Sequence, residues 1–401
     1  MSAPTFVIAS LPGQGRANPY VDLFYDALQA HGVELYSEPT IDLEWGRQHF
    51  TRIDALHFHW PEWIWLNAKA STARPDFFWL LRARLPGFWR ADSAIDRLRQ
   101  STLYRRWSQR TAEKMAVQRF STFLSAAKQS GVRVIWTMHN AEGHDSWSRR
   151  DRAGFLALSK RADLVIYHSE DARQECLRRY GPSCPVVVMP HGNYNGVYPA
   201  PRPRDEVLAA HGLDPALPVA GCIGSLRRNK GIDVAVRAVQ QLRGEMQLIC
   251  AGKPHRMFQL DELEQLVMHA PGIALVPKML SDQEFADLSS ACDVLLLPYR
   301  EITGSGALLA ALTFGRGVIV SDLPYFREVL TGNEDVGLLV PADDPHALAD
   351  GIRRYLAVAP SRRSAAALQL AAKYAWPEVV KPVVTELRRL HAAGKPCNIV
   401  R

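Results

Sequence analysis

Short apolar runs alternate with longer amphipathic stretches along most of the chain. A strand followed by a helical pattern, repeated many times, predicts right-handed βαβ units around mainly parallel sheets. The runs that predict strands are residues 6–10, 55–59, 132–138, 164–168, 186–190, 219–223, 247–251, 273–276, 294–298 and 318–321. We therefore expect an α/β protein.

A proline cluster, Pro199, Pro201 and Pro203, interrupts this alternation, which then begins again. Proline-rich segments are typical of linkers between domains. The chain has 401 residues, more than one hydrophobic core usually serves. We predict two Rossmann-like, doubly wound domains that face one another across a cleft, residues 1–198 and 199–370, followed by a C-terminal helix in residues 371–401.

One segment departs from the alternation. Residues 78–119 carry ten basic side chains against three acidic ones, with aromatic and leucine side chains between them. Such a composition suits a helix that lies in an anionic membrane surface. The alternative is an insertion, residues 73–125, that packs on the N-terminal domain with a solvated basic face. No recognised nucleic-acid module accompanies the segment, so no nucleic-acid partner is expected.

The overall charge and the cysteine pattern bear on location. The formal net charge of +7 favours anionic partners. The six cysteines form no CxxC pair, which fits a reducing compartment. We expect no signal peptide, and no uninterrupted apolar run reaches about 18 residues. We expect a cytoplasmic protein, peripheral on the inner face of the plasma membrane.

The loop after the first predicted strand is rich in glycine. Gly13 and Gly15 precede a helical pattern, and glycine lets a ligand approach backbone amides at the positive end of a helix. A tight turn without a ligand is the alternative. Asn18 interrupts the dinucleotide-binding fingerprint, and no acidic residue follows at the expected distance. A nicotinamide oxidoreductase is therefore disfavoured.

The strands at residues 55–59 and 132–138 are both followed by polar groups. His57 and His59 alternate like a metal-binding pair, but no third ligand lies nearby, so we expect no metal there. They should line an acceptor cleft instead, with Glu62 exposed in the next loop. After the other strand come side chains that can bind a sugar or accept a proton, or that form a surface loop with incidental histidines: His139, Asn140, Glu142, His144 and Asp145.

Two loops of the second half suit phosphate. Arg227 and Lys230 stand between a strand and a helix, where two cations can neutralise a diphosphate leaving group without a metal. The alternative is a solvated basic turn. Gly304, Ser305 and Gly306 begin another helix and offer amides and a hydroxyl to phosphate oxygens.

The order of these motifs resembles the GT-B superfamily, especially glycosyltransferase family 4. Asn18-Pro19-Tyr20, the stretch 56–62, and His139-Asn140 with His144-Asp145 are similar to a smaller group, the inverting β-mannosyltransferases of exopolysaccharide assembly (xanthan-pathway type). The resemblance spans most of the chain apart from the basic segment.

The resemblance implies a role for each motif. Arg227, Lys230 and the Gly304–Gly306 turn would hold the donor diphosphate, and Asn140 would also bind the donor. The Gly13–Arg16 loop would lie near the donor phosphates or the acceptor. His139 would lie beside the donor sugar, and Trp376 would belong to a crossover that returns the C-terminal helix to the first domain. The candidates for the base, in order of preference, are Asp145, His144, Glu142 and Glu62.

The sequence departs from the family pattern in one respect. Many retaining members carry two glutamates eight positions apart, and these positions hold Ile302 and Ala310 here, with Glu301 displaced by one. This departure favours an inverting enzyme.

The resemblance also implies the substrates. The expected donor is GDP-mannose, with a UDP-sugar such as UDP-glucose as the alternative. The expected acceptor is a lipid-linked saccharide, and neither a metal nor a cofactor is expected. A non-transferring GT-B protein, either an epimerase or a sugar-binding scaffold, is the other reading.

Overall fold

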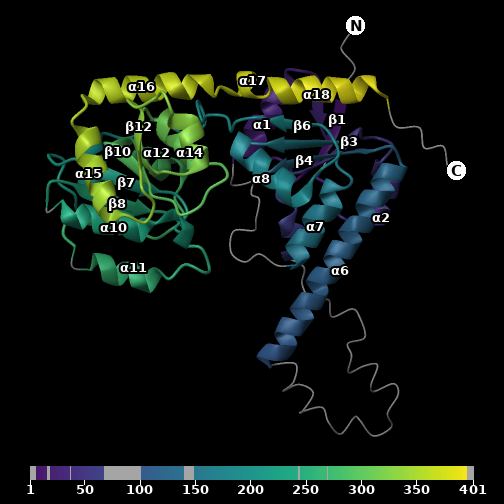
Figure 1. Ribbon diagram of the computed structural model, residues 1–401, viewed down its shortest axis with the longest axis horizontal. Helices are drawn as coiled ribbons and strands as arrows, with labels where there is room; N and C mark the ends of the chain where they lie inside the picture. Colours follow the sequence, from purple (N-terminus) through teal and green to yellow (C-terminus); the bar gives the residue numbers. More distant parts are fainter. Residues whose placement is uncertain are drawn as a thin grey trace, which may run out of the picture.

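The protein contains two α/β units, each built on a six-stranded sheet in which every strand pair is parallel (Figure 1). The structure is a computed structural model that describes residues 6–15, 19–36, 38–66, 101–139, 149–242, 244–268 and 270–394. Each statement below concerns these residues.

The first sheet has the strand order β2-β1-β3-β4-β5-β6. The strands are β1 (Phe6–Leu11), β2 (Val33–Leu35), β3 (Ala55–Phe58), β4 (Arg133–Met138), β5 (Leu164–Tyr167) and β6 (Val186–Val188). The helices of this unit are α1 (Tyr20–Gln29), α2 (Leu43–His49), α3 (Glu62–Leu66), α6 (Thr102–Gln129), α7 (Arg149–Ser159) and α8 (Glu170–Tyr180). The strand order reverses between β1 and β3, and ligands of open α/β sheets bind at such a point, beyond the carboxyl ends of the strands.

The second sheet has the order β12-β11-β10-β7-β8-β9, which reverses between β10 and β7. Its strands are β7 (Val219–Ile223), β8 (Gln247–Ala251), β9 (Ile273–Val276), β10 (Val294–Leu297), β11 (Val318–Ser321) and β12 (Gly337–Val340). Its helices are α9 (Arg204–Ala210), α10 (Ile232–Gln241), α11 (Leu260–Val267), α12 (Asp282–Ala291), α13 (Gly306–Thr313), α14 (Pro324–Leu330) and α15 (Pro345–Leu356).

The predicted strands all occur, with ends that differ by at most two residues. The central strands read as continuous apolar runs because a parallel sheet is covered by helices on both faces. The apolar pattern did not predict β2 or β12. Both lie at an edge of their sheet. Strand β2 has only three residues, with Glu34 at its centre, whereas β12 is a four-residue apolar run that the pattern missed.

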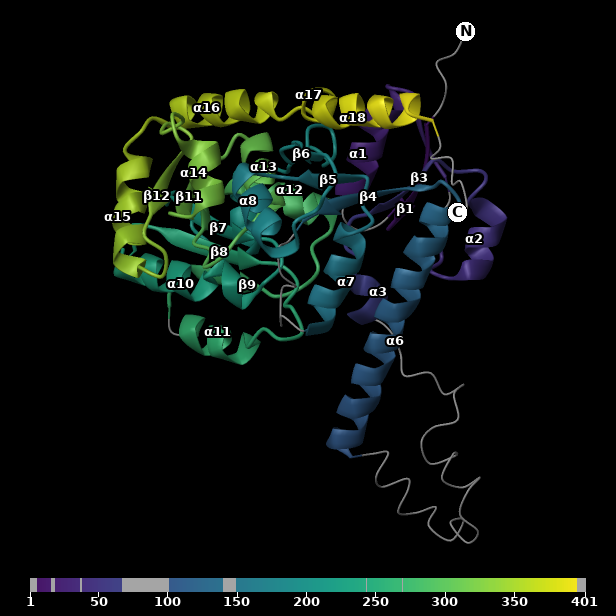
Figure 2. The ribbon, with the colours of Figure 1, turned by 45° about the vertical axis from the view of Figure 1, so that its right-hand side comes forward.

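Helix α6 extends from the first sheet outward past α7 (Figure 2). Its second half is anchored, because Phe120, Phe123 and Leu124 are fully buried in the core of the first unit. Arg110 and Lys114, in the first half of the helix, are exposed. Residues 67–100, which hold much of the basic aromatic segment, lie outside the described residues.

The C-terminal helices tie the two units together (Figure 1). Helix α16 (Pro360–Lys373) packs on α13 of the second unit. Helices α17 (Trp376–Val379) and α18 (Lys381–Ala392) share a core with strand β1 and helix α1 of the first unit. At the crossing, Trp376 Nε1 donates to the carbonyl of Asn193 at 2.8 Å.

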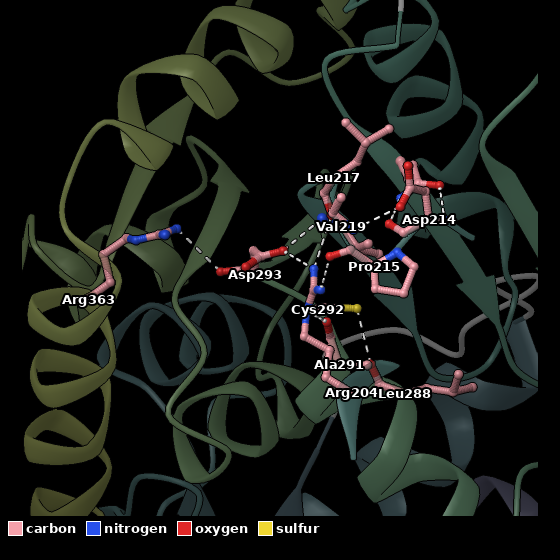
Figure 3. Close-up of polar contacts among 12 residues, drawn as sticks. Arg204, Asp214, Pro215, Leu217, Val219, Leu288, Ala291, Cys292, Asp293 and Arg363 are labelled. Atoms are coloured by element: carbon pink, nitrogen blue, oxygen red, sulfur yellow. Dashed lines mark hydrogen bonds and ion pairs between the residues drawn. The ribbon is translucent and has the colours of Figure 1, made fainter. Parts of the chain in front are cut away.

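Arg204 holds the amino end of the second sheet (Figure 3). Its guanidinium donates to the carbonyls of Pro215 (2.6 Å) and Leu217 (3.1 Å) and to the carboxylate of Asp293 (3.0 Å). Asp293 also accepts from the amide of Val219 at 2.8 Å, where β7 begins. These charged hydrogen bonds lie at the end of the sheet opposite the loops that carry Arg227 and Gly304, so their role is structural.

Candidate functional site

Histidines gather at the carboxyl end of the first sheet. They come from β3 or follow β3, β4, β5 and β6 within three residues, and they are His57, His59, His139, His168 and His191. Tyr20, the first residue of α1, lies among them. Its ring centroid is 4.8 Å from that of His139, 5.0 Å from that of His191 and 5.3 Å from that of His168.

Three of these histidines form a hydrogen-bonded chain. His59 Nδ1 lies 3.3 Å from His139 Nε2, His139 Nδ1 lies 3.2 Å from His168 Nε2, and His168 Nδ1 lies 2.9 Å from the carbonyl oxygen of Met189. Burial lowers the pKa of His168 to about 4. Burial, with His168 and His59 nearby, also holds the pKa of His139 well below its usual value, so the rings are neutral at pH 7.

The carbonyl of Met189 determines the tautomers that we assign to this chain. A carbonyl can only accept, so His168 carries its proton on Nδ1 and His139 must donate to its Nε2. His59 must then donate to His139. His59 Nε2 is left as a buried acceptor that has no hydrogen-bond partner in the described structure.

His57 is held separately from this chain. Its Nδ1 lies 2.7 Å from the Tyr25 hydroxyl and its Nε2 lies 2.8 Å from Thr137 Oγ1. Burial lowers the pKa of His57 to about 3. Among the described residues, no group of three or more His, Cys, Asp or Glu side chains is arranged to hold a metal ion.

Glu62 is buried, although the sequence predicted an exposed loop residue. It begins helix α3 and is only 8% exposed. Burial raises the pKa of Glu62 to about 7, and the nearby carboxylate of Asp151 adds to the effect. Asp151 accepts a hydrogen bond from Trp65 Nε1 at 2.7 Å, which fixes it beside α3. The prediction was wrong because Glu62 shares a helix face with Trp65, which faces the core.

The other predicted residues between β4 and α7 cannot be placed. Asn140, Glu142, His144 and Asp145 lie outside the described residues. Asp151, the carboxylate beside Glu62, stands in α7, the helix that follows this stretch in the sequence.

The glycine loop after β1 is held by a hydrogen bond to helix α1. Gly15 has a positive φ of 76°, and its amide donates to the carboxylate of Asp22 in α1 at 2.9 Å. A side chain at Gly13 would meet Glu38, whose Cβ would lie 3.3 Å from the added Cβ. The amide of Gly15 is thus engaged within the protein in this conformation. Arg16 lies outside the described residues.

The loops after β7 and β10 approach one another closely at the reversal point of the second sheet. Gly231 has a φ of 61°, and a Cβ there would lie 2.0 Å from the carbonyl oxygen of Pro298, so only glycine fits. The amide of Arg300 donates to the carbonyl of Asn229 at 2.8 Å. These contacts fix the turn that carries Arg227 and Lys230.

The cations of these loops fall into two kinds. Arg300 forms ion pairs with Asp233 (2.9 Å) and Asp343 (2.7 Å), so its charge is neutralised within the protein. In the described part of the chain, neither Arg227 nor Lys230 has such a carboxylate partner. Burial, with Arg227 nearby, lowers the pKa of Lys230 to about 8, which leaves it mainly protonated at pH 7. Half-buried cations without counter-ions favour an anionic ligand.

The Gly304–Gly306 turn lies between the two sheet edges. Ser305 caps helix α13 by accepting from the amide of Leu308 at 3.1 Å. A Cβ at Gly304 would lie 3.6 Å from His168 Cβ, so the positive end of this helix approaches the histidine edge. Ala310, at the position of the missing second glutamate, is buried in this helix and offers no polar group.

Polar contacts join the two units beside the histidines. Thr303 Oγ1 donates to the carbonyl of His139 at 2.9 Å, and Ser169 Oγ donates to the carbonyl of Thr303 at 3.3 Å. The carboxylate of Glu328 accepts from the amide of Glu170 at 3.1 Å, at the positive end of α8.

Sequence reasoning missed several of these residues. His168 ends one predicted strand and His191 follows another, and the rule that ligands bind at strand carboxyl ends could have found them. Tyr20 was named only within the Asn18-Pro19-Tyr20 motif, and no local pattern indicated roles for Thr303 and Arg300, because the residues they contact are far away in the sequence.

Comparison with known families and structures agrees with this geometry. The model of Glycosyltransferase Family 4 matches residues 79–193, and the model of Glycosyl transferases group 1 matches residues 217–358. The sucrose-phosphate synthase of Thermosynechococcus elongatus has a similar fold, with a TM-score of 0.65 at 18% identity, covering 98% of this chain and 100% of that chain. Anabaena HepE in complex with UDP and glucose gives a TM-score of 0.62 at 13% identity, covering 97% and 99%.

These matches define the class: the chain has the GT-B fold, as predicted. Its first unit matches the family 4 model and its second unit matches the group 1 model, which confirms the resemblance to GT-B glycosyltransferases noted in the motifs.

Curated relatives of this chain include two mannosyltransferases. The chain is 29% identical over 250 residues to the lipopolysaccharide core biosynthesis mannosyltransferase LpsB of Rhizobium meliloti, covering 60% of this chain and 66% of that protein. It is 22% identical over 319 residues to the GDP-mannose:glycolipid 4-beta-D-mannosyltransferase of Xanthomonas campestris pv. campestris, covering 79% and 73%. The match spans between 55% and 66% of the length of LpsB and three other relatives.

Proposed function

We propose that the protein is a glycosyltransferase that transfers a hexose from a nucleotide sugar to a saccharide acceptor. One observation carries the proposal. Arg227 and Lys230 present positive charge without a carboxylate partner in the described structure, on a turn fixed against the loop that leads to helix α13. The histidine edge that approaches this loop is uncharged at pH 7, which suits a neutral sugar.

The proposed reaction is a single in-line displacement. An acceptor oxygen forms a bond to the anomeric carbon while the bond from that carbon to the diphosphate oxygen breaks. The electron pair leaves with the diphosphate, and Arg227 and Lys230 stabilise its charge. A base takes the proton of the acceptor hydroxyl. Since the cations can supply the stabilising charge, we propose that the reaction needs no metal.

Glu62 is the described candidate that best suits the base. Its pKa of about 7 matches a group that must accept a proton near neutral pH. Asp145, His144 and Glu142 remain candidates from the sequence. His139 is assigned to positioning, because both of its ring nitrogens already have histidine partners.

The proposed donor is GDP-mannose, used with inversion. The names of the two mannosyltransferase relatives and the lack of a glutamate at Ala310 support this choice. A UDP-sugar is the alternative, supported by the likeness in fold to a protein solved with UDP and glucose. Thermal-shift measurements with GDP, UDP and ADP, followed by a donor panel with NMR assignment of the product anomer, test both choices.

Two outcomes would reject the proposal. Stabilisation by none of the nucleotides would favour a sugar-binding scaffold. Release of an epimerised sugar or free nucleotide without any acceptor would favour an epimerase. Transfer that survives EDTA would support the metal-free mechanism.

The proposed acceptor is a lipid-linked saccharide, reached from the cytoplasmic surface of a membrane through residues 78–119. No described helix is long and apolar enough to cross a bilayer. The exposed Arg110 and Lys114 of α6 support attraction to anionic lipid. Co-flotation with phosphatidylglycerol vesicles but not with phosphatidylcholine vesicles is expected, and equal recovery with both would reject this role.

A further inference from the structure

Three aromatic rings stack in series from the histidine edge to the protein surface. The ring centroid of Trp60 lies 4.2 Å from the ring centroid of His139, with 15° between the two ring planes. The ring centroid of Trp63 lies 5.5 Å from that of Trp60, with 18° between the two ring planes. The amide of Trp63 donates to the carbonyl of Trp60 at 3.2 Å, which fixes the spacing of the two indoles.

The outer ring of this series is open to solvent. Trp63 is 51% exposed, and it is the only aromatic side chain among the large exposed apolar residues of the described structure. Trp65, two residues later in the same helix, is 1% exposed and forms part of the core. Trp63 belongs to none of the described core clusters, so the fold does not explain the exposed indole.

The position of Trp63 connects it to the proposed reaction. It follows Glu62, the candidate base, and its stack ends at His139, whose carbonyl accepts from Thr303 of the second unit. An indole held by stacking is already ordered before a ligand arrives, so little entropy is lost on binding. A pyranose ring presents C–H groups on its face and can lie flat on such a surface while its hydroxyls remain in water.

We propose that the exposed face of Trp63 is an acceptor subsite that binds a pyranose ring. This inference rests on the proposed function and deepens it. The terminal sugar of the acceptor would lie beside Glu62, and the sugar unit before it would lie on Trp63. The subsite therefore favours acceptors with at least two sugar units.

Transfer kinetics test the subsite. The probes are octyl glycosides with one-sugar or two-sugar head groups built from glucose, mannose or galactose. Trp63→Ala should raise the KM for two-sugar acceptors about tenfold, the amount that one aromatic stacking contact provides, and leave kcat nearly unchanged. The KM for one-sugar acceptors should not change. Trp63→Phe should recover much of the affinity.

Leu66→Ala is the matched control, because Leu66 lies on the same helix and is 42% exposed. It should leave both KM values unchanged. Equal KM values for wild type and Trp63→Ala with every two-sugar probe would overturn the subsite. So would an equal rise with one-sugar and two-sugar probes.

Saturation-transfer NMR separates this inference from the proposed function, because it needs no transfer. In the wild type, the protons of the sugar unit next to the octyl chain should be saturated, and Trp63→Ala should abolish that signal. If the signal behaves so while no nucleotide binds, the proposed transferase activity fails and the sugar subsite stands. If nucleotides bind and the signal survives the substitution, the subsite fails alone.

Discussion

Each of the two parallel sheets reverses its strand order at one point, and the edges at these two points differ in charge. The edge of the first sheet is built from neutral histidines and aromatic rings, because burial lowers the pKa of each histidine there. The edge of the second sheet carries Arg227 and Lys230, and only glycine fits at Gly231, where its loops touch. A reaction that creates negative charge on one group needs cations at that group and uncharged contacts elsewhere. The contrast therefore matches sugar transfer away from a diphosphate.

The contact between the units brings the neutral edge and the charged edge together. Gly304 approaches His168, and Thr303 binds the carbonyl of His139, so the positive end of α13 meets the neutral edge. The following changes test the contrast, from the largest expected effect to the smallest.

Replacing Glu62 by glutamine should have the largest effect. The amide cannot accept a proton, so the transfer rate should fall by about a thousandfold. Isothermal titration with the donor nucleotide should give nearly wild-type affinity, since the diphosphate site is unchanged. Full activity in Glu62→Gln, with loss of activity in Asp145→Asn, would mean that the base is Asp145 and not Glu62.

Removing either free cation should come next. Arg227→Ala or Lys230→Ala should lower turnover by about a hundredfold or more, because the leaving group loses one charged contact. Arg237→Ala, an exposed arginine on α10, is the control and should be neutral. Wild-type-like activity in both Arg227→Ala and Lys230→Ala would reject the assigned diphosphate site.

A methyl group at Gly231 should destabilise the fold. The added Cβ would lie 2.0 Å from the Pro298 carbonyl at a φ of 61°, so we expect a loss of about 3 kcal/mol of unfolding free energy in urea. Gly332→Ala is the matched control, with a φ of 78° and open space, and should cost about 1 kcal/mol. Equal losses would mean that the close approach of the two loops is unimportant.

The pH dependence of transfer gives the smallest and most specific test. Only ionised Glu62 can act as a base, so kcat/KM should rise with pH through about 7. Asp151→Asn removes a negative charge that raises this pKa and should move the rise to lower pH. An unchanged pH profile in Asp151→Asn would mean that the charge of Asp151 does not influence the group whose titration controls the rate.

The sequence alone predicted every strand except β2 and β12, the two α/β units and the GT-B class, because these depend on local apolar runs and on the order of motifs. It also singled out Arg227 and Lys230 from their place between a strand and a helix. It failed for Glu62, whose burial depends on Trp65 and Asp151, residues that reach it through helix packing.

The tertiary structure decided which charges remain available and which rings meet. Arg300 and Lys230 are both cationic residues in a loop that follows a strand. Of the two, only Arg300 has its charge neutralised, by carboxylates from α10 and from the loop after β12. His59, His139 and His168 become one chain because parallel strands bring their carboxyl ends to the same edge. Local patterns encode the elements, whereas pKa values and stacking depend on neighbours that only folding brings into contact.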